Sequence, residues 1–244
     1  MKIQLKKIGT VCLMAGLGLG FFTSCDDDPK PVVFDAKVDA FVQKVKVGDD
    51  IKYVPTFYAY ANKNLKSVKV VNGSKTYTLA KYAHGGENNF RYISTGAEVV
   101  DAMPAAATFK YTVTSADDEV KTIDENVGTE QLGEMAIKAL TYESNGTFKV
   151  TWDKLTDAET YAVKAFDTDG NQLFISPIIA GTTKEFSFGK NSTGWLDQSK
   201  KFEDDKLYRI ELLAFRYETG ASDKAYNIQF VSVGEKSTKW NPAN

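Results

Sequence analysis

The sequence predicts an all-β protein built from two tandem β-sandwich domains. No long segment keeps the period of about 3.6 residues that marks an amphipathic helix. Short alternating runs between turn signals prevail instead, and the clearest is 147–152, where Phe148, Val150 and Trp152 share one face. Such runs recur along most of the chain, as they do in two-sheet sandwiches.

The region 132–240 carries the clearest strand pattern. After 147–152, we expect further strands over 161–166, 172–179, 186–188, 208–214 and 226–233. Between the first two of these, residues 167–171 form a turn cluster of Asp, Gly and Asn. About seven strands in a segment of this length favour a β-sandwich.

The positions of three aromatic residues in this region resemble the pattern of a fibronectin type III domain. Trp152 ends an early strand, Tyr161 opens the next strand after an acidic turn, and Tyr208 precedes alternating apolar residues in a late strand. The resemblance covers most of 132–234, although 202–206 lacks the usual Leu-x-Pro and 189–201 is an insertion. It implies a fold and leaves the function open.

The region 32–127 reads as a second, loosely immunoglobulin-like sandwich. Asn72-Gly73 predicts a hairpin turn, and Pro55 predicts an edge strand or a bulge. The segment 82–107 is irregular, with a short helix expected over 96–103 before Pro104. Polar residues 124–134 suit the boundary between the two domains.

The N-terminus reads as an export signal over 1–24. A lysine-rich head is followed by the uncharged run 8–22, which is shorter than the roughly 20 apolar residues of a membrane-spanning helix. A positive head with a short apolar core is typical of a secretory signal. The acidic and proline-containing segment 25–31 then reads as an extended linker.

Residues 22–25 (Phe-Thr-Ser-Cys) resemble a lipobox, where signal peptidase II cleaves and a lipid is attached to Cys25. Phe22 departs from the usual Leu, as in the looser boxes of Bacteroidetes-type lipoproteins. The alternative is a secreted protein with a chance cysteine. The resemblance implies lipid anchoring in the outer membrane, and an acidic run after the cysteine resembles a surface-export signal: Asp26, Asp27 and Asp28. In enterobacterial lipoproteins, an Asp in this position would instead imply inner-membrane retention.

Composition argues against several functions. The formal charge is −2 and no basic stretch is present, which disfavours nucleic-acid binding. There is one histidine, His84, so a catalytic triad or a multi-histidine zinc site would depend on it alone. Asp167, Asp169 and Asn171 lack the Gly and Glu that complete an EF-hand loop, so we expect a hairpin turn there and no resident metal or cofactor.

Aromatic and amide side chains are the best binding candidates. Sugar rings stack on aromatic faces, and amides bond to their hydroxyls. The candidates are Tyr82, Asn88, Asn89, Phe90, Tyr92 and Trp195. Trp195 lies in the insertion and is expected to be exposed, whereas core packing is the competing role for the tyrosines.

The leading hypothesis is therefore a non-catalytic binding module on the cell surface, held to the membrane through its lipid and recognising a glycan or a partner protein. The resemblance to Bacteroidetes-type lipoproteins implies an association with glycan uptake. Two alternatives stay open. One is a structural or adhesive stalk, like a fimbrial component, that uses edge strands for contact. The other is a hydrolase with two carboxylates in one cleft.

Overall fold

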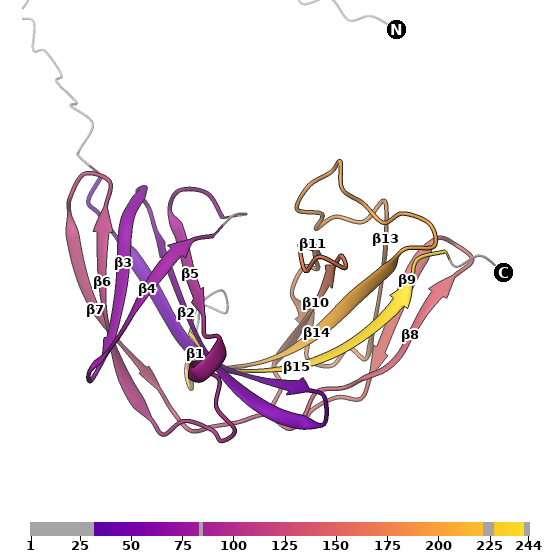
Figure 1. Cartoon of the computed structure of the whole chain (residues 1–244), viewed down its shortest axis with the longest axis horizontal. Helices are drawn as coiled ribbons and strands as arrows, with labels where there is room; N and C mark the ends of the chain where they lie inside the picture. Colours follow the sequence, from indigo (N-terminus) through magenta and orange to yellow (C-terminus); the bar gives the residue numbers. More distant parts are fainter. Residues whose placement is uncertain (1–31, 83–84, 222–226, 242–244) are drawn as a thin grey trace, which may run out of the picture. The chain divides into compact units, whose positions relative to one another are not determined.

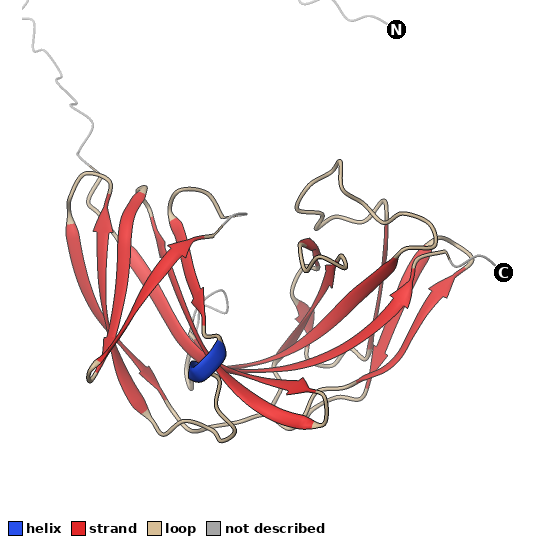
Figure 2. Cartoon of the chain, viewed as in Figure 1, coloured by secondary structure: helices blue, strands red, loops and turns tan. Residues whose placement is uncertain are grey.

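A computed structural model describes residues 32–82, 85–221 and 227–241, and strands account for nearly all of its regular structure (Figure 2). The prediction of an all-β fold with a sandwich arrangement is confirmed. The short helix expected over 96–103 is reduced to a single 3-10 turn, η1 (Gly96–Glu98). The predicted signal segment, Cys25 and the three aspartates that follow it lie outside the described residues.

The N-terminal sandwich contains strands β1 to β7. Their bounds are β1 (Ala36–Val47), β2 (Asp50–Ala61), β3 (Leu65–Asn72), β4 (Lys75–Lys81), β5 (Asn89–Ile93), β6 (Ala107–Ser115) and β7 (Val120–Val127). Hydrogen bonds connect them in the order β1-β2-β5-β4-β3-β6-β7. β4 pairs with β3 and, at its C-terminal end, with β5, so it joins the two sides of the sandwich.

Alternation places the core of this sandwich. Val68, Val70 and Val113 are fully buried, as the period of two predicts for strands with one face inward. Tyr111 is buried with them, and its hydroxyl donates to the backbone oxygen of Asp39 at 2.7 Å. The expected hairpin is present, because Asn72 pairs with Lys75 and Gly73 takes a φ of +57°.

Pro55 does not mark an edge strand. β2 lies inside the sheet, between β1 and β5. The ring is tolerated because the carbonyl of Pro55 accepts from Ser94 just where the β2–β5 ladder ends at Ile93, so the missing N–H faces the end of the ladder.

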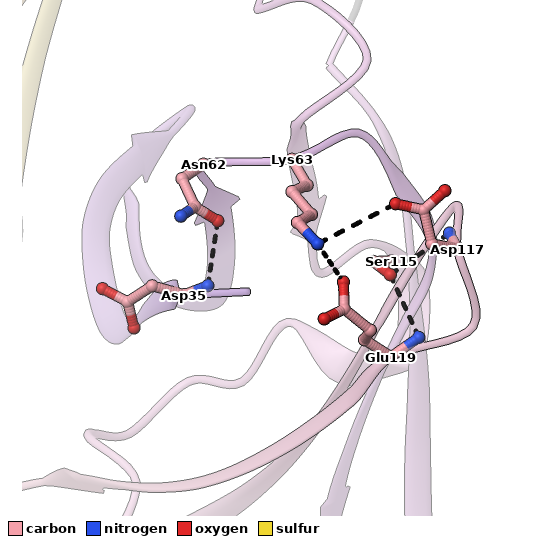
Figure 3. Close-up of polar contacts among 6 residues, drawn as sticks. All are labelled: Asp35, Asn62, Lys63, Ser115, Asp117 and Glu119. Carbon is pink, nitrogen blue, oxygen red and sulfur yellow. Dashed lines mark hydrogen bonds and ion pairs between the residues drawn. The ribbon is translucent and has the colours of Figure 1, made fainter. Parts of the chain in front are cut away.

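Polar contacts join the start of β1 to the end of β2, and the segment after β2 to the β6–β7 turn (Figure 3). The Asp35 amide donates to the Asn62 side chain at 2.9 Å, while Lys63 forms ion pairs with Asp117 and Glu119. The Ser115 hydroxyl accepts from two amides of the same turn. The Asp35–Asn62 hydrogen bond therefore fixes the chain just before β1 begins.

The C-terminal sandwich contains strands β8 to β15. Their bounds are β8 (Ile137–Glu143), β9 (Thr147–Trp152), β10 (Thr160–Phe166), β11 (Gln172–Ile175), β12 (Ile179–Ala180), β13 (Glu185–Gly189), β14 (Leu207–Tyr217) and β15 (Ile228–Lys239). A three-stranded sheet, β13-β9-β8, faces the array β11-β10-β14-β15 across an aromatic core.

Two features implied by the fibronectin type III resemblance are present. The ring of Trp152 is buried, with its centroid 5.4 Å from that of Tyr161. The hydroxyl of Tyr208 accepts from the Glu203 amide at 2.8 Å, five residues upstream. This is the bond of a tyrosine corner, and it closes the loop that precedes β14.

The two sandwiches share one sheet. β1 and β15 pair in parallel, with Val42 opposite Phe230 and Lys44 opposite Ser232 (Figure 1). The hydroxyl of Ser232 also accepts from the Met135 amide at 3.0 Å and donates to the Gly133 carbonyl at 2.8 Å. These contacts connect the segment between the sandwiches to β15. Because β1 pairs with β15, one continuous hydrogen-bonded sheet runs from β11 to β7.

Tyr208→Phe tests the tyrosine corner. The change keeps the ring and removes the acceptor of the Glu203 amide, so we expect the free energy of unfolding to fall by about 1–3 kcal/mol. Chemical denaturation measures the change. Tyr142→Phe is the control, at a half-buried tyrosine of the same sandwich whose hydroxyl forms no hydrogen bond among the described residues, and an equal loss in both variants would contradict the assignment.

Candidate binding cleft

The shared sheet has a second face, which carries a smaller buried cluster of Phe41, Leu213 and Val231 apart from the main core. Register places Gln43 of β1 opposite Val54 of β2, and Arg91 of β5 lies on the same face. Through the β1–β15 pair this face continues to Glu211 of β14 and Lys164 of β10, which lie opposite each other. Residues from both sandwiches are therefore carried on one surface.

A cleft of about 720 Å³ lies on this face. Its size falls within the range of about 300–1,000 Å³ that is usual for small-ligand sites. The wall combines strand residues with the 167–171 turn and the insertion. The polar and aromatic residues of the lining are Gln43, Arg91, Ser94, Lys164, Phe166, Asn171, Gln172, Asp197, Lys200 and Glu211.

Arg91 and Lys164 are two of the three cations that line the cleft, with Lys200, and neither forms an ion pair with an acid among the described residues. Arg91 lies over the ring of Tyr82, 4.1 Å from its centroid, and forms no hydrogen bond or ion pair among the described residues. Lys164 likewise has none there. Burial lowers the pKa of Lys164, the charge of Glu211 opposes this change, and the charges of Arg91 and Arg209 add to it. Lys164 and Arg91 are thus close enough to repel each other.

The acids of the cleft are already engaged. Glu211 forms an ion pair with Arg209, whose guanidinium also lies over the ring of Phe166. Asp197 accepts from the amide and the hydroxyl of Ser199, at 2.8 Å and 2.6 Å. The acids therefore do not saturate Arg91 and Lys164.

Two neutral donors of the cleft also lack partners. The hydroxyl oxygen of Ser94, a residue only 2% exposed, and the amide nitrogen of Gln172 are buried without a hydrogen bond among the described residues. An unmet buried polar group costs about 1–3 kcal/mol. Four unpaired polar groups lining one cleft indicate a site for a polar ligand.

The predicted loop candidates act mainly in packing. The Asn88 side chain donates to the Ala61 carbonyl at 2.8 Å, and Phe90 lies in the core opposite Ala59. Tyr92 packs against Phe57, and its hydroxyl donates to Glu98.

Tyr82 supports Arg91 through its ring, while the Asn89 carbonyl accepts from the Tyr82 amide at 2.8 Å. The structure does not assemble these residues into an aromatic platform. The cleft residue that the sequence analysis did not single out is Arg91. Its signal was parity, because Phe90 and Tyr92 point inward on β5 and Arg91 points to the opposite face.

The expectation that Trp195 is exposed was wrong. Trp195 is 6% exposed and packs edge-on against Phe174 and Phe202. Its indole N–H donates to the Gly189 carbonyl at 3.2 Å. The insertion folds back over the sandwich because Trp195 forms a bridge with Phe174, so the ring closes the core.

The turn at 167–171 is a hairpin turn, as predicted. The Asp167 carboxylate accepts from the amides of Asp169 and Asn171, at 3.0 Å and 2.8 Å. Within residues 32–82, 85–221 and 227–241, no group of three or more His, Cys, Asp or Glu residues is arranged to hold a metal ion. Over the same ranges, no helix is long and apolar enough to cross a membrane.

No family model matches the chain, and no curated protein matches it. Solved structures do match. A two-domain fibronectin type III segment from chicken tenascin is 10% identical, covering 83% of this chain and 99% of that one, with a TM-score of 0.31. A cytokine receptor complex gives 8% identity, coverage of 85% and 98%, and a TM-score of 0.31.

A tetra-tandem repeat from the extending region of a large adhesion protein is 15% identical. The match covers 84% of this chain and 49% of that one, with a TM-score of 0.27.

Glu125 and Glu218 line a second hollow, and the charge of the buried Asp39 acts on Glu125. Asp39 is 2% exposed and accepts from the Ile228 amide with both oxygens, and burial raises its pKa well above the usual value. Burial, a hydrogen bond to Glu218 and the charges of Glu218 and Asp39 raise the pKa of Glu125 to about 8.

Glu125→Gln is expected to flatten the dependence of stability on pH. Because the pKa of Glu125 rises from 4.5 to about 8 on folding, the folded state binds more protons. The contribution is complete below about pH 4.5 and is lost as the pH rises through 8. Urea unfolding between pH 5 and 9 measures it. Glu130→Gln, at an exposed residue of the same hollow, is the control, and an unchanged slope in Glu125→Gln would contradict the assignment.

Proposed function

We propose that this chain is a non-catalytic binding module of the bacterial cell envelope, anchored by a lipid on Cys25 and recognising its ligand in the cleft. One observation carries the binding part: unpaired polar groups from both sandwiches, Arg91, Ser94, Lys164 and Gln172, line the same cleft. A fold that keeps the polar atoms of Ser94 and Gln172 buried without partners gives up stability at a place where a ligand regains it.

The ligand classes are those that the sequence predicts, a glycan or a partner protein. The cleft favours a glycan, because its neutral lining is rich in the amide and hydroxyl groups that bond to sugar hydroxyls. A flat protein surface would cover an area larger than this cleft.

A glycoside hydrolase is less well supported. The two catalytic carboxyls of such enzymes lie about 5 Å or more apart. Burial and the neighbouring charges of Glu218 and Asp39 account for the raised pKa of Glu125, so this pKa does not by itself indicate a catalytic pair. In the main cleft, Glu211 and Asp197 are each occupied by a partner.

Cys25→Ser tests the anchor. Wild-type protein is expected to partition into the detergent phase and to remain with carbonate-washed membranes, because acyl chains bind the bilayer firmly. The variant is expected in the aqueous phase, while Cys12→Ser, inside the predicted signal, behaves as wild type. Replacing the three aspartates 26–28 by asparagine tests surface export, since the anchored product would then resist protease added to intact cells. Membrane retention of Cys25→Ser would contradict lipidation.

Ser94→Ala and Gln172→Leu test the cleft before any ligand is known. Each removes an unmet buried polar atom, so we expect each to stabilise the fold by about 1 kcal/mol and to weaken ligand binding. Thermal denaturation and a glycan array provide the two measurements.

The control is Ser176→Ala. The Ser176 hydroxyl accepts from the Val163 amide and donates to the Pro177 carbonyl, so this variant is expected to be destabilised. Loss of stability in Ser94→Ala or Gln172→Leu would show that these atoms serve the fold. Unchanged binding in both would remove the cleft as the site, and capture of a co-assembling surface protein by all variants would favour the stalk.

A further inference from the structure

The presence of both Arg91 and Lys164 in one cleft indicates the chemical class of the ligand. The two cations come from different sandwiches, β5 and β10, and line one cleft. Resting on the function proposed above, we infer that the cleft binds an acidic saccharide, whose carboxylate or sulfate group lies between Arg91 and Lys164.

An anion is indicated by how the charges are arranged. Lys164 is largely desolvated, and the nearby Arg91 and Arg209 further disfavour its charge, while Glu211 is drawn to Arg209. A bound anion would relieve this repulsion and satisfy both donors. The planar guanidinium of Arg91 is held over Tyr82, which leaves its N–H groups able to bond an oxyanion in pairs.

The remaining lining favours a sugar over a highly charged polymer. Ser94, Gln172, Asn171 and Gln43 provide neutral hydrogen-bonding groups in the same cleft, and the half-buried Phe166 provides an apolar surface. Asp197 and Glu211 offset part of the positive charge, which disfavours dense polyanions such as nucleic acids. One anionic group surrounded by hydroxyls matches this mixture.

The test measures calorimetric affinity of the full lipidated chain in detergent. The probes are galacturonate oligosaccharides, their carboxyl-reduced neutral counterparts, and sulfated disaccharides. We expect acidic probes to bind and neutral ones to bind at least about tenfold more weakly, since hydrogen bonds to charged groups are among the stronger ones. The sulfated and carboxylated arms distinguish the two sources of the anion.

Charge-removing variants assign the effect to residues. Lys164→Met keeps the length of the side chain and removes its charge, and Arg91→Gln removes the guanidinium. Each variant is expected to lower the affinity for acidic probes about tenfold or more and to leave the affinity for neutral probes unchanged. Arg91→Lys is expected to recover part of the affinity. The matched control is Lys69→Met on the exposed side of β3. Melting curves confirm that each variant is folded.

Several outcomes would overturn the inference. Equal affinity for acidic and neutral probes would show that the cleft does not recognise an anionic group. Wild-type affinity in both charge variants would show the same. Binding of an acidic peptide such as poly-glutamate in place of the saccharides would change the class of ligand, and failure of every acidic saccharide would reject it. The proposed function would still hold after these results if the Ser94 and Gln172 variants altered the binding of another ligand. If those variants altered no binding, the proposed function would be rejected as well.

Discussion

The parallel pair of β1 and β15 is the contact on which the rest of the described structure depends. Without it, the chain would be two sandwiches with separate sheets. With it, Gln43 lies beside Val231, and the outer faces of both sheets become one surface. The cleft follows from this register, and so does the presence of both Arg91 and Lys164 in its wall. A slip of one residue would turn the outward face of β1 inward.

Much of the fold was accessible from the sequence because alternation is a local property. The strand at 147–152, the Asn72-Gly73 hairpin, the turn beginning at Asp167 and the tyrosine corner at Tyr208 all depend on residues close to one another in the chain. Side-chain parity and turn chemistry are sufficient to predict such features.

The remainder depends on which distant segments meet. Parity shows that Arg91 points away from the core of its sandwich, but it does not show that β10 lies across the same face. Trp195 was misjudged for a related reason. A tryptophan in a polar insertion reads as exposed until the Phe174 bridge brings it over the core. Pro55 was misplaced because a proline is tolerated inside a sheet wherever a ladder ends.

The position of β15 in the chain has a consequence for how the molecule forms. Of the described strands it is synthesised last, yet its neighbours in the sheet are β14 and the first strand, β1. Until it arrives, the edges of both neighbours lack a partner and can pair with other chains. Closing the sheet also joins segments near opposite ends of the described chain, and such distant pairing is slow. Folding would therefore benefit from a factor that shields those edges until the last strand has formed.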